Sequence, residues 1–132
     1  MNNESEVHNP RMSKGNLGCH EYIVGFTPAD DILRIDKDEP NADITSVKYS
    51  KHKAGDKRST DAGSDDQCRI TMIVKGGPWK QQMWLEGEDR KIIELTKEGD
   101  YIAWEPGYCH TWEALGDTTM LTVSFRRRNT NL

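Results

Sequence analysis

The chain has 132 residues, enough for one domain, and its 22 acidic against 18 basic side chains give a net charge of −4. Proteins that bind nucleic acid usually carry an excess of basic charge, so this balance argues against a nucleic-acid partner. Mean hydropathy is −0.85, and no apolar run approaches the roughly 20 residues that cross a membrane. Residues 1–15 lack the apolar stretch of a signal peptide, so we expect a cytoplasmic protein without membrane contact.

Short strands separated by turn residues are predicted along the chain. Residues 1–18 are polar and are expected to form a flexible segment, followed by a single domain over 19–128 and a tail over 129–132. Aromatic and β-branched residues predict strands at 21–26, 32–35, 44–49, 69–75, 79–85, 91–95, 101–104 and 120–125, with another through His110 and Trp112. No segment has a helical period over three turns, so the chain is predicted to be all-β, as a sandwich or a barrel.

The longest polar stretch, residues 51–67, separates two of these predicted strands. Loops longer than about 12–15 residues are uncommon in compact domains unless they are functional or disordered. His52 lies there in a lysine-rich patch that disfavours cations, and we expect it to be a solvated surface side chain.

The most informative pattern lies in residues 99–125, GDYIAWEPGYCHTWEALGDTTMLTVSF. The spacing of Gly99, Gly107 and His110 resembles the second signature of the cupins, a superfamily of small β-barrels. Glu105 stands where that signature has proline. The resemblance implies a double-stranded β-helix, the cupin jelly-roll barrel, whose inner cavity is a natural small-molecule site.

The resemblance also raises the question of a bound metal. Metal-binding cupins use three histidines and one glutamate, and three of these come from a first signature. Between Gly55 and Gly76, where that signature would fall, neither its histidines nor its glutamate appear, and Asp61 takes one histidine position. His110 and Asp61 are the remaining candidate ligands, too few to hold a divalent ion tightly. The cofactor prediction is therefore none, or a weakly held divalent metal.

Without a metal, His110 is the candidate catalytic residue, because an imidazole with an ordinary pKa near 6.5 can transfer protons at neutral pH. The chain is similar here to cupin epimerases and isomerases that pair a cavity histidine with a tyrosine, which makes Tyr101, Tyr108 and Tyr49 candidates. Arg69 would hold a carboxylate or phosphate, unless it is a strand residue that faces solvent. Trp112, on the same strand face as His110, would stack on the ligand, unless it belongs to the core or a dimer interface. The competing interpretation is that His110 only ties its glycine-rich turn.

The sequence thus predicts a small-molecule-binding cupin whose cavity around His110 accepts a polar or anionic organic ligand. The alternative is a cupin enzyme, either a metal-dependent oxygenase or isomerase or a metal-free sugar epimerase. Of Trp79 and Trp84, one must face outward, which favours a homodimer interface. A purely structural domain with a filled cavity is the third possibility.

Overall fold

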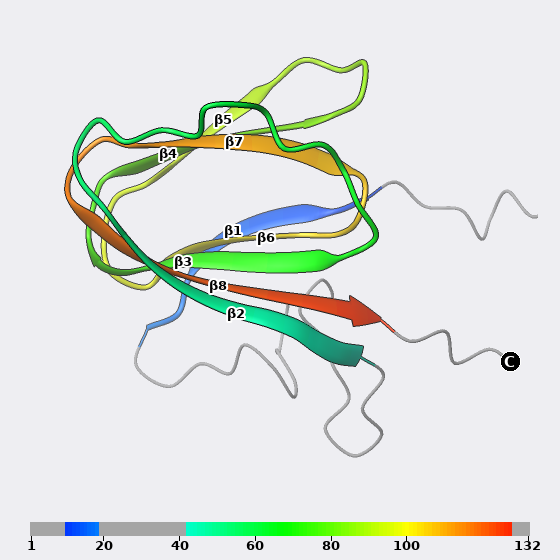
Figure 1. Ribbon diagram of the computed structural model, residues 1–132, viewed down its shortest axis with the longest axis horizontal. Coiled ribbons are helices and arrows are strands. Elements are labelled where there is room, and N and C mark those ends of the chain that lie inside the picture. Colours follow the sequence, from blue (N-terminus) through cyan, green and yellow to red (C-terminus); the bar gives the residue numbers. More distant parts are fainter. Residues whose placement is uncertain (1–9, 19–41, 128–132) are drawn as a thin grey trace, which may run out of the picture.

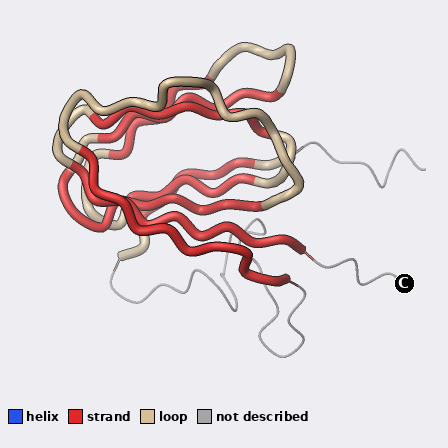
Figure 2. The backbone as a smooth tube through the Cα atoms, viewed as in Figure 1, coloured by secondary structure: helices blue, strands red, loops and turns tan. Residues whose placement is uncertain are grey.

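The computed structural model describes residues 10–18 and 42–127, and within them the chain is all-β, as predicted (Figure 2). The strands are β1 (Met12–Asn16), β2 (Ala42–His52), β3 (Cys68–Gly76), β4 (Trp79–Leu85), β5 (Lys91–Leu95), β6 (Asp100–Trp104), β7 (Tyr108–Ala114) and β8 (Thr118–Arg127). The strands predicted at 21–26 and 32–35 lie outside the described residues. None of the described residues forms a helix that could cross a bilayer.

The strands form two antiparallel sheets that face each other as the two walls of a barrel (Figure 1). One sheet has five strands in the order β1-β6-β3-β8-β2, and the other has three in the order β5-β4-β7. This arrangement is the double-stranded jelly roll that the resemblance implied.

β1 lies inside the range 1–18, for which the sequence predicted no strand. Met12–Asn16 pairs along its whole length with β6. The adjacent Arg11 donates hydrogen bonds from its backbone and guanidinium to Glu105, which is only 3% exposed. The polar composition concealed this strand, because backbone pairing to β6 and an ion pair need few apolar side chains.

The apolar core between the sheets is built from alternate residues of the predicted strands. Its members are Ile73, Trp79, Met83, Leu95, Ile102, Trp104, Tyr108, Ala114 and Met120. Trp79, Trp104 and Met120 also line the cavity described below, so one side of the core is the cavity's apolar part. Trp84 faces away from the core, and the Arg90 guanidinium covers its ring at 3.8 Å.

The turn glycines of the signature behave as their sequence context predicts. Gly99 and Gly107 have φ angles of 87° and 113°, in the left-handed region that favours glycine. A Cβ atom on Gly107 would lie 2.7 Å from Pro10 Cγ. These turns set the start of β6 and β7 and thereby the position of His110.

Candidate functional site

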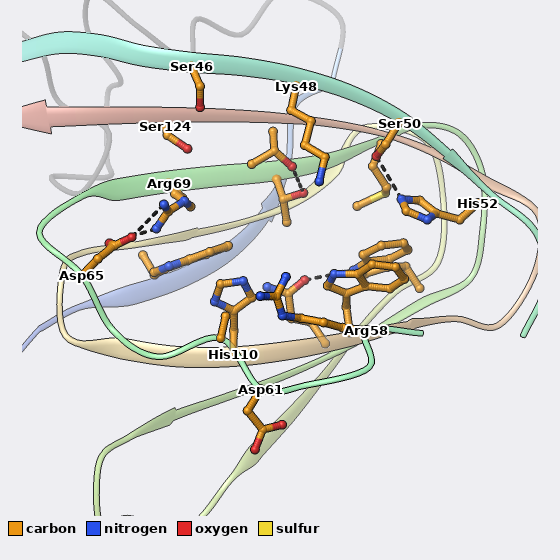
Figure 3. Close-up of a pocket in the computed structure, with 18 of the residues that line it drawn as sticks. Ser46, Lys48, Ser50, His52, Arg58, Asp61, Asp65, Arg69, His110 and Ser124 are labelled. Atoms are coloured by element: carbon orange, nitrogen blue, oxygen red, sulfur yellow. Dashed lines mark hydrogen bonds and ion pairs between the residues drawn. The ribbon is translucent and has the colours of Figure 1, made fainter. Parts of the chain in front are cut away.

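An open cavity of about 490 Å³ lies between the two sheets, in the size range of small-molecule sites (Figure 3). Strands β2, β3 and β8 of the large sheet form one wall of it. Strands β4 and β7 of the small sheet, together with the segment 53–67, form the opposite wall. The cavity therefore draws on both sheets and on the longest polar stretch of the sequence.

The polar face of β2 points into this cavity. Ser46, Lys48, Ser50 and His52 line the cavity, whereas the alternate residues Val47 and Tyr49 are 62% and 61% exposed on the outside. The predicted alternation is thus present. Its orientation is the reverse of an ordinary core strand, because this face borders a polar cavity and not the core.

The segment 53–67 runs along β7 and brings its own side chains to the cavity. Arg58 N–H donates to the carbonyl of Trp112 at 3.0 Å. The backbones of Ala62 and His110 exchange two hydrogen bonds of 2.8 and 3.0 Å. The predicted loop therefore acts as an irregular extra strand, and it presents Arg58 to the interior.

His110 projects from β7 into the cavity, beside Trp104 at a ring separation of 5.2 Å. Desolvation, together with the positive charges of Arg69 and Arg58, lowers its pKa from 6.5 to about 4, against the opposing effect of Asp65. The imidazole is therefore neutral at neutral pH. Its Nδ1 atom is buried and has no hydrogen-bond partner among the described residues, so it does not tie the glycine-rich turn through that atom.

The cations of the cavity differ in how they are neutralised. Arg69 donates two hydrogen bonds to the carboxylate of Asp65, at 3.0 and 2.8 Å, and this contact holds the pKa of Asp65 below its usual value. Lys48 and Arg58 form no ion pair with any residue in the described ranges 10–18 and 42–127. Both point into the cavity from opposite walls (Figure 3).

An aromatic cluster closes one end of the cavity. Trp79 and Trp112 stack with their ring centroids 4.8 Å apart, and the His52 ring meets Trp112 edge-on at 4.5 Å. Gln81, which is 1% exposed, accepts a hydrogen bond from the indole N–H of Trp79 at 2.9 Å. The expectation of a solvated surface His52 is therefore wrong, because the strand turns it inward onto two tryptophans. Burial lowers the pKa of His52.

The structure brings some of the predicted site residues together and separates others. His110, Trp112 and Arg69 all line the cavity. Tyr101 packs instead against a separate apolar cluster of the five-stranded sheet, formed by Ile70, Met72, Ala103 and Val123. Tyr108 is 7% exposed in the apolar core, where desolvation and the charges of nearby glutamates raise its pKa. The two tyrosines are therefore not placed to contact a ligand beside His110.

The residues present do not fit the metal site of three histidines and one glutamate. Asp61 borders the cavity, but its carboxylate turns away from His110 and pairs with Arg90 (Figure 3). Two guanidinium groups influence His110, and they would repel a cation. Within the described part of the chain, no three histidine, cysteine, aspartate or glutamate side chains are placed to share an ion.

Sequence reasoning did not select several residues that the cavity contains. These are Ser46, Lys48, Ser50, Arg58, Trp79, Gln81, Trp104 and Ser124. The residues on β2 could have been found from the alternation of that strand, because every second residue after Ile44 is polar. Arg58 had no comparable signal, because nothing in a polar loop says which side chain will point inward.

No protein-family model matches this sequence, and no curated protein matches it. Similarity appears in solved structures. A mutant of the 3,4-ketoisomerase QdtA from Thermoanaerobacterium thermosaccharolyticum, in complex with TDP-4-keto-6-deoxyglucose, aligns with a TM-score of 0.58 and 16% identity, covering 91% of this chain and 83% of that chain.

Two further structures extend the comparison. The 3'-monoepimerase ChmJ from Streptomyces bikiniensis, in complex with dTDP-quinovose, aligns with a TM-score of 0.53 and 13% identity, covering 61% of this chain and 46% of that chain. The CENP-C cupin domain of Drosophila melanogaster aligns with a TM-score of 0.50 and 17% identity, covering 63% of this chain and 60% of that chain. This chain thus spans less than two thirds of either structure. At these identities the likeness concerns the fold, and the chain has the double-stranded β-helix fold of the cupins.

Proposed function

We propose that this protein binds a small anionic organic molecule in the cavity between its two sheets. The observation that carries the proposal is a pair of cations, Lys48 and Arg58, which enter one cavity from opposite walls and form no ion pair with a described residue. A cleft with an excess of positive charge attracts anionic ligands. A guanidinium suits a carboxylate or phosphate because it can donate two parallel hydrogen bonds.

The neutral state of His110 supports the same ligand chemistry. A neutral imidazole can donate one hydrogen bond and accept another. It can therefore contact an acid group without adding a positive charge to those of Lys48 and Arg58. An anion bound between Arg58 and His110 would offset the charge that lowers the pKa of His110. Ligand binding would therefore raise that pKa toward its ordinary value.

The test is calorimetric titration with a panel of small carboxylates and phosphates, on the full chain and on the variants Arg58→Gln and Lys48→Gln. Each variant should weaken anion binding by about tenfold, because a hydrogen bond to a charged group contributes roughly 1.5–3 kcal/mol. Lys80→Gln is the matched control, since Lys80 pairs with Glu113 at 3.3 Å and does not line the cavity. Equal affinity in Arg58→Gln and the unmodified protein would contradict the proposal.

The second candidate function is an enzyme that uses His110. Its buried Nδ1 atom, which has no hydrogen-bond partner in the described part of the chain, favours this function. The ketoisomerase and the epimerase with this fold were solved in complex with TDP-4-keto-6-deoxyglucose and dTDP-quinovose, respectively. In the present chain, an anionic substrate would raise the pKa of His110 and make it a better base. The enzyme candidate predicts that His110→Gln abolishes turnover of such a substrate while calorimetric binding persists. Turnover that survives this change would exclude it.

A further inference from the structure

We infer that the bound anion is a hydroxylated aliphatic acid, and not an aromatic acid or a nucleotide. The inference rests on the proposed function, because it concerns the rest of the molecule whose acid group Arg58 and Lys48 would bind. It follows from the two walls of the cavity, which differ in chemistry.

The wall formed by β2, β3 and β8 is rich in hydroxyl groups. They belong to Ser46, Ser50, Thr71, Thr122 and Ser124. Such a wall is costly to bury without partners, because each hydroxyl must give up water. Hydroxyl groups on a ligand can replace the lost hydrogen bonds to water, since each can both donate and accept a hydrogen bond.

Two of these hydroxyls are free to bind a ligand. The Thr71 and Thr122 hydroxyls bond to each other at 2.7 Å, and Ser50 bonds to His52 at 2.9 Å. Ser46 and Ser124 lie opposite each other on β2 and β8, and their hydroxyls have no hydrogen bond with any residue of the described chain. Ser124 is only 4% exposed, so its hydroxyl has little contact with bulk water. Figure 3 shows both serines on the upper wall, on the same side as Lys48.

The aromatic rings of the cavity are already engaged with one another. Trp79 and Trp112 stack at 4.8 Å, and His52 lies edge-on against Trp112 at 4.5 Å. Trp79 and Trp104 are 3% and 2% exposed, so neither presents an open face. A nucleobase or phenyl ring would need such a face for stacking. The cavity thus favours hydroxyl groups over a flat ring.

Four probes test this assignment by calorimetric titration. Gluconate carries an acid and five hydroxyls, hexanoate is an aliphatic acid of the same chain length without hydroxyls, phenylacetate carries a ring, and thymidine diphosphate carries a base. Gluconate should bind at least about tenfold more tightly than hexanoate, because two net hydrogen bonds of roughly 1 kcal/mol each correspond to more than a factor of ten. It should also bind more tightly than phenylacetate and thymidine diphosphate.

A variant locates the effect in the cavity. Ser124→Ala removes a hydroxyl that has no bond to lose, so stability should be retained while gluconate binding weakens by about fivefold and hexanoate binding is unchanged. Thr119→Ala is the matched control, because Thr119 lies on β8 outside this cavity. It should leave gluconate binding unchanged.

The outcomes separate this inference from the proposed function. Tighter binding of phenylacetate or thymidine diphosphate than of gluconate, with loss of that binding in Arg58→Gln, would overturn the hydroxylated acid and support the anion site. Equal binding of gluconate and hexanoate would also overturn it. Failure of all four probes to bind would overturn both proposals.

Discussion

Ala62 and His110 exchange two backbone hydrogen bonds, Ala62 N–H to His110 O at 2.8 Å and His110 N–H to Ala62 O at 3.0 Å. This isolated bridge joins a polar loop to the strand that carries the cavity histidine. The position of Arg58, four residues earlier in the same loop, depends on such contacts. The loop and the histidine therefore form one structural unit.

Ala62→Pro should separate this unit, because proline has no N–H to donate to His110. We expect a loss of about 1–2 kcal/mol in unfolding free energy, together with weaker anion binding as Arg58 moves. Urea unfolding and calorimetry measure the two effects, and Ala62→Ser, which keeps the N–H, is the control. Unchanged stability and affinity in Ala62→Pro would show that the bridge does not position the loop.

Arg90 anchors the other side of the loop from outside the cavity. Its guanidinium pairs with Asp61 and lies over the Trp84 ring at 3.8 Å. Arg90→Ala should cost about 1 kcal/mol of stability, because exposed ion pairs and cation–π contacts each contribute roughly 0.5–1 kcal/mol. Affinity for the anion should fall a few-fold, because a less firmly held loop would let the anion dissociate faster. Lys80→Ala breaks a partly exposed ion pair between β4 and β7, and it should leave affinity for the anion unchanged. An equal loss of affinity in both variants would count against an anchoring role for Arg90.

Stability should fall as pH drops from 6.5 toward 4, owing to His110. Its pKa is 6.5 in the unfolded chain and about 4 in the folded one, so in this window the unfolded state binds the extra proton. The accumulated loss is about 3 kcal/mol at pH 4, since one pKa unit corresponds to roughly 1.4 kcal/mol. His52, whose pKa is also lowered, acts in the same direction.

Urea unfolding between pH 7 and pH 4 measures this dependence. His110→Gln should remove most of it, because glutamine does not titrate, and His52→Gln should remove a smaller part. A pH dependence in His110→Gln as steep as in the unmodified protein would contradict the buried, neutral state of His110.

The ion pair between Arg11 and Glu105 should be a stability determinant. Glu105 is 3% exposed and accepts the Arg11 guanidinium at 3.0 and 2.8 Å. Arg11→Ala weakens the neutralisation of a buried carboxylate and should cost about 1–3 kcal/mol at pH 7. The double variant Arg11→Met with Glu105→Gln should recover part of that loss, and thermal unfolding of both measures it. No difference between the single and double variants would exclude coupling between the two side chains.

Local sequence determined strands β2 to β8, because the apolar alternation and the turn glycines are properties of neighbouring residues. Gly99 and Gly107 adopt the positive φ angles that their context predicted. His110 and Trp112 share a strand face, as their spacing of two requires, and both line the cavity. These features need no knowledge of distant segments.

Only the tertiary structure decided which side chains meet in the cavity. Alternation along β2 defines two faces, but it does not say that the face with Lys48 borders a cavity while Val47 faces out. Tyr101 and Tyr108 were equally good candidates by sequence, and the packing of β6 and β7 turned them away. Arg58 reaches the interior because its loop hydrogen-bonds to β7. Contacts between segments far apart in the chain set these positions, and such contacts have no local signature.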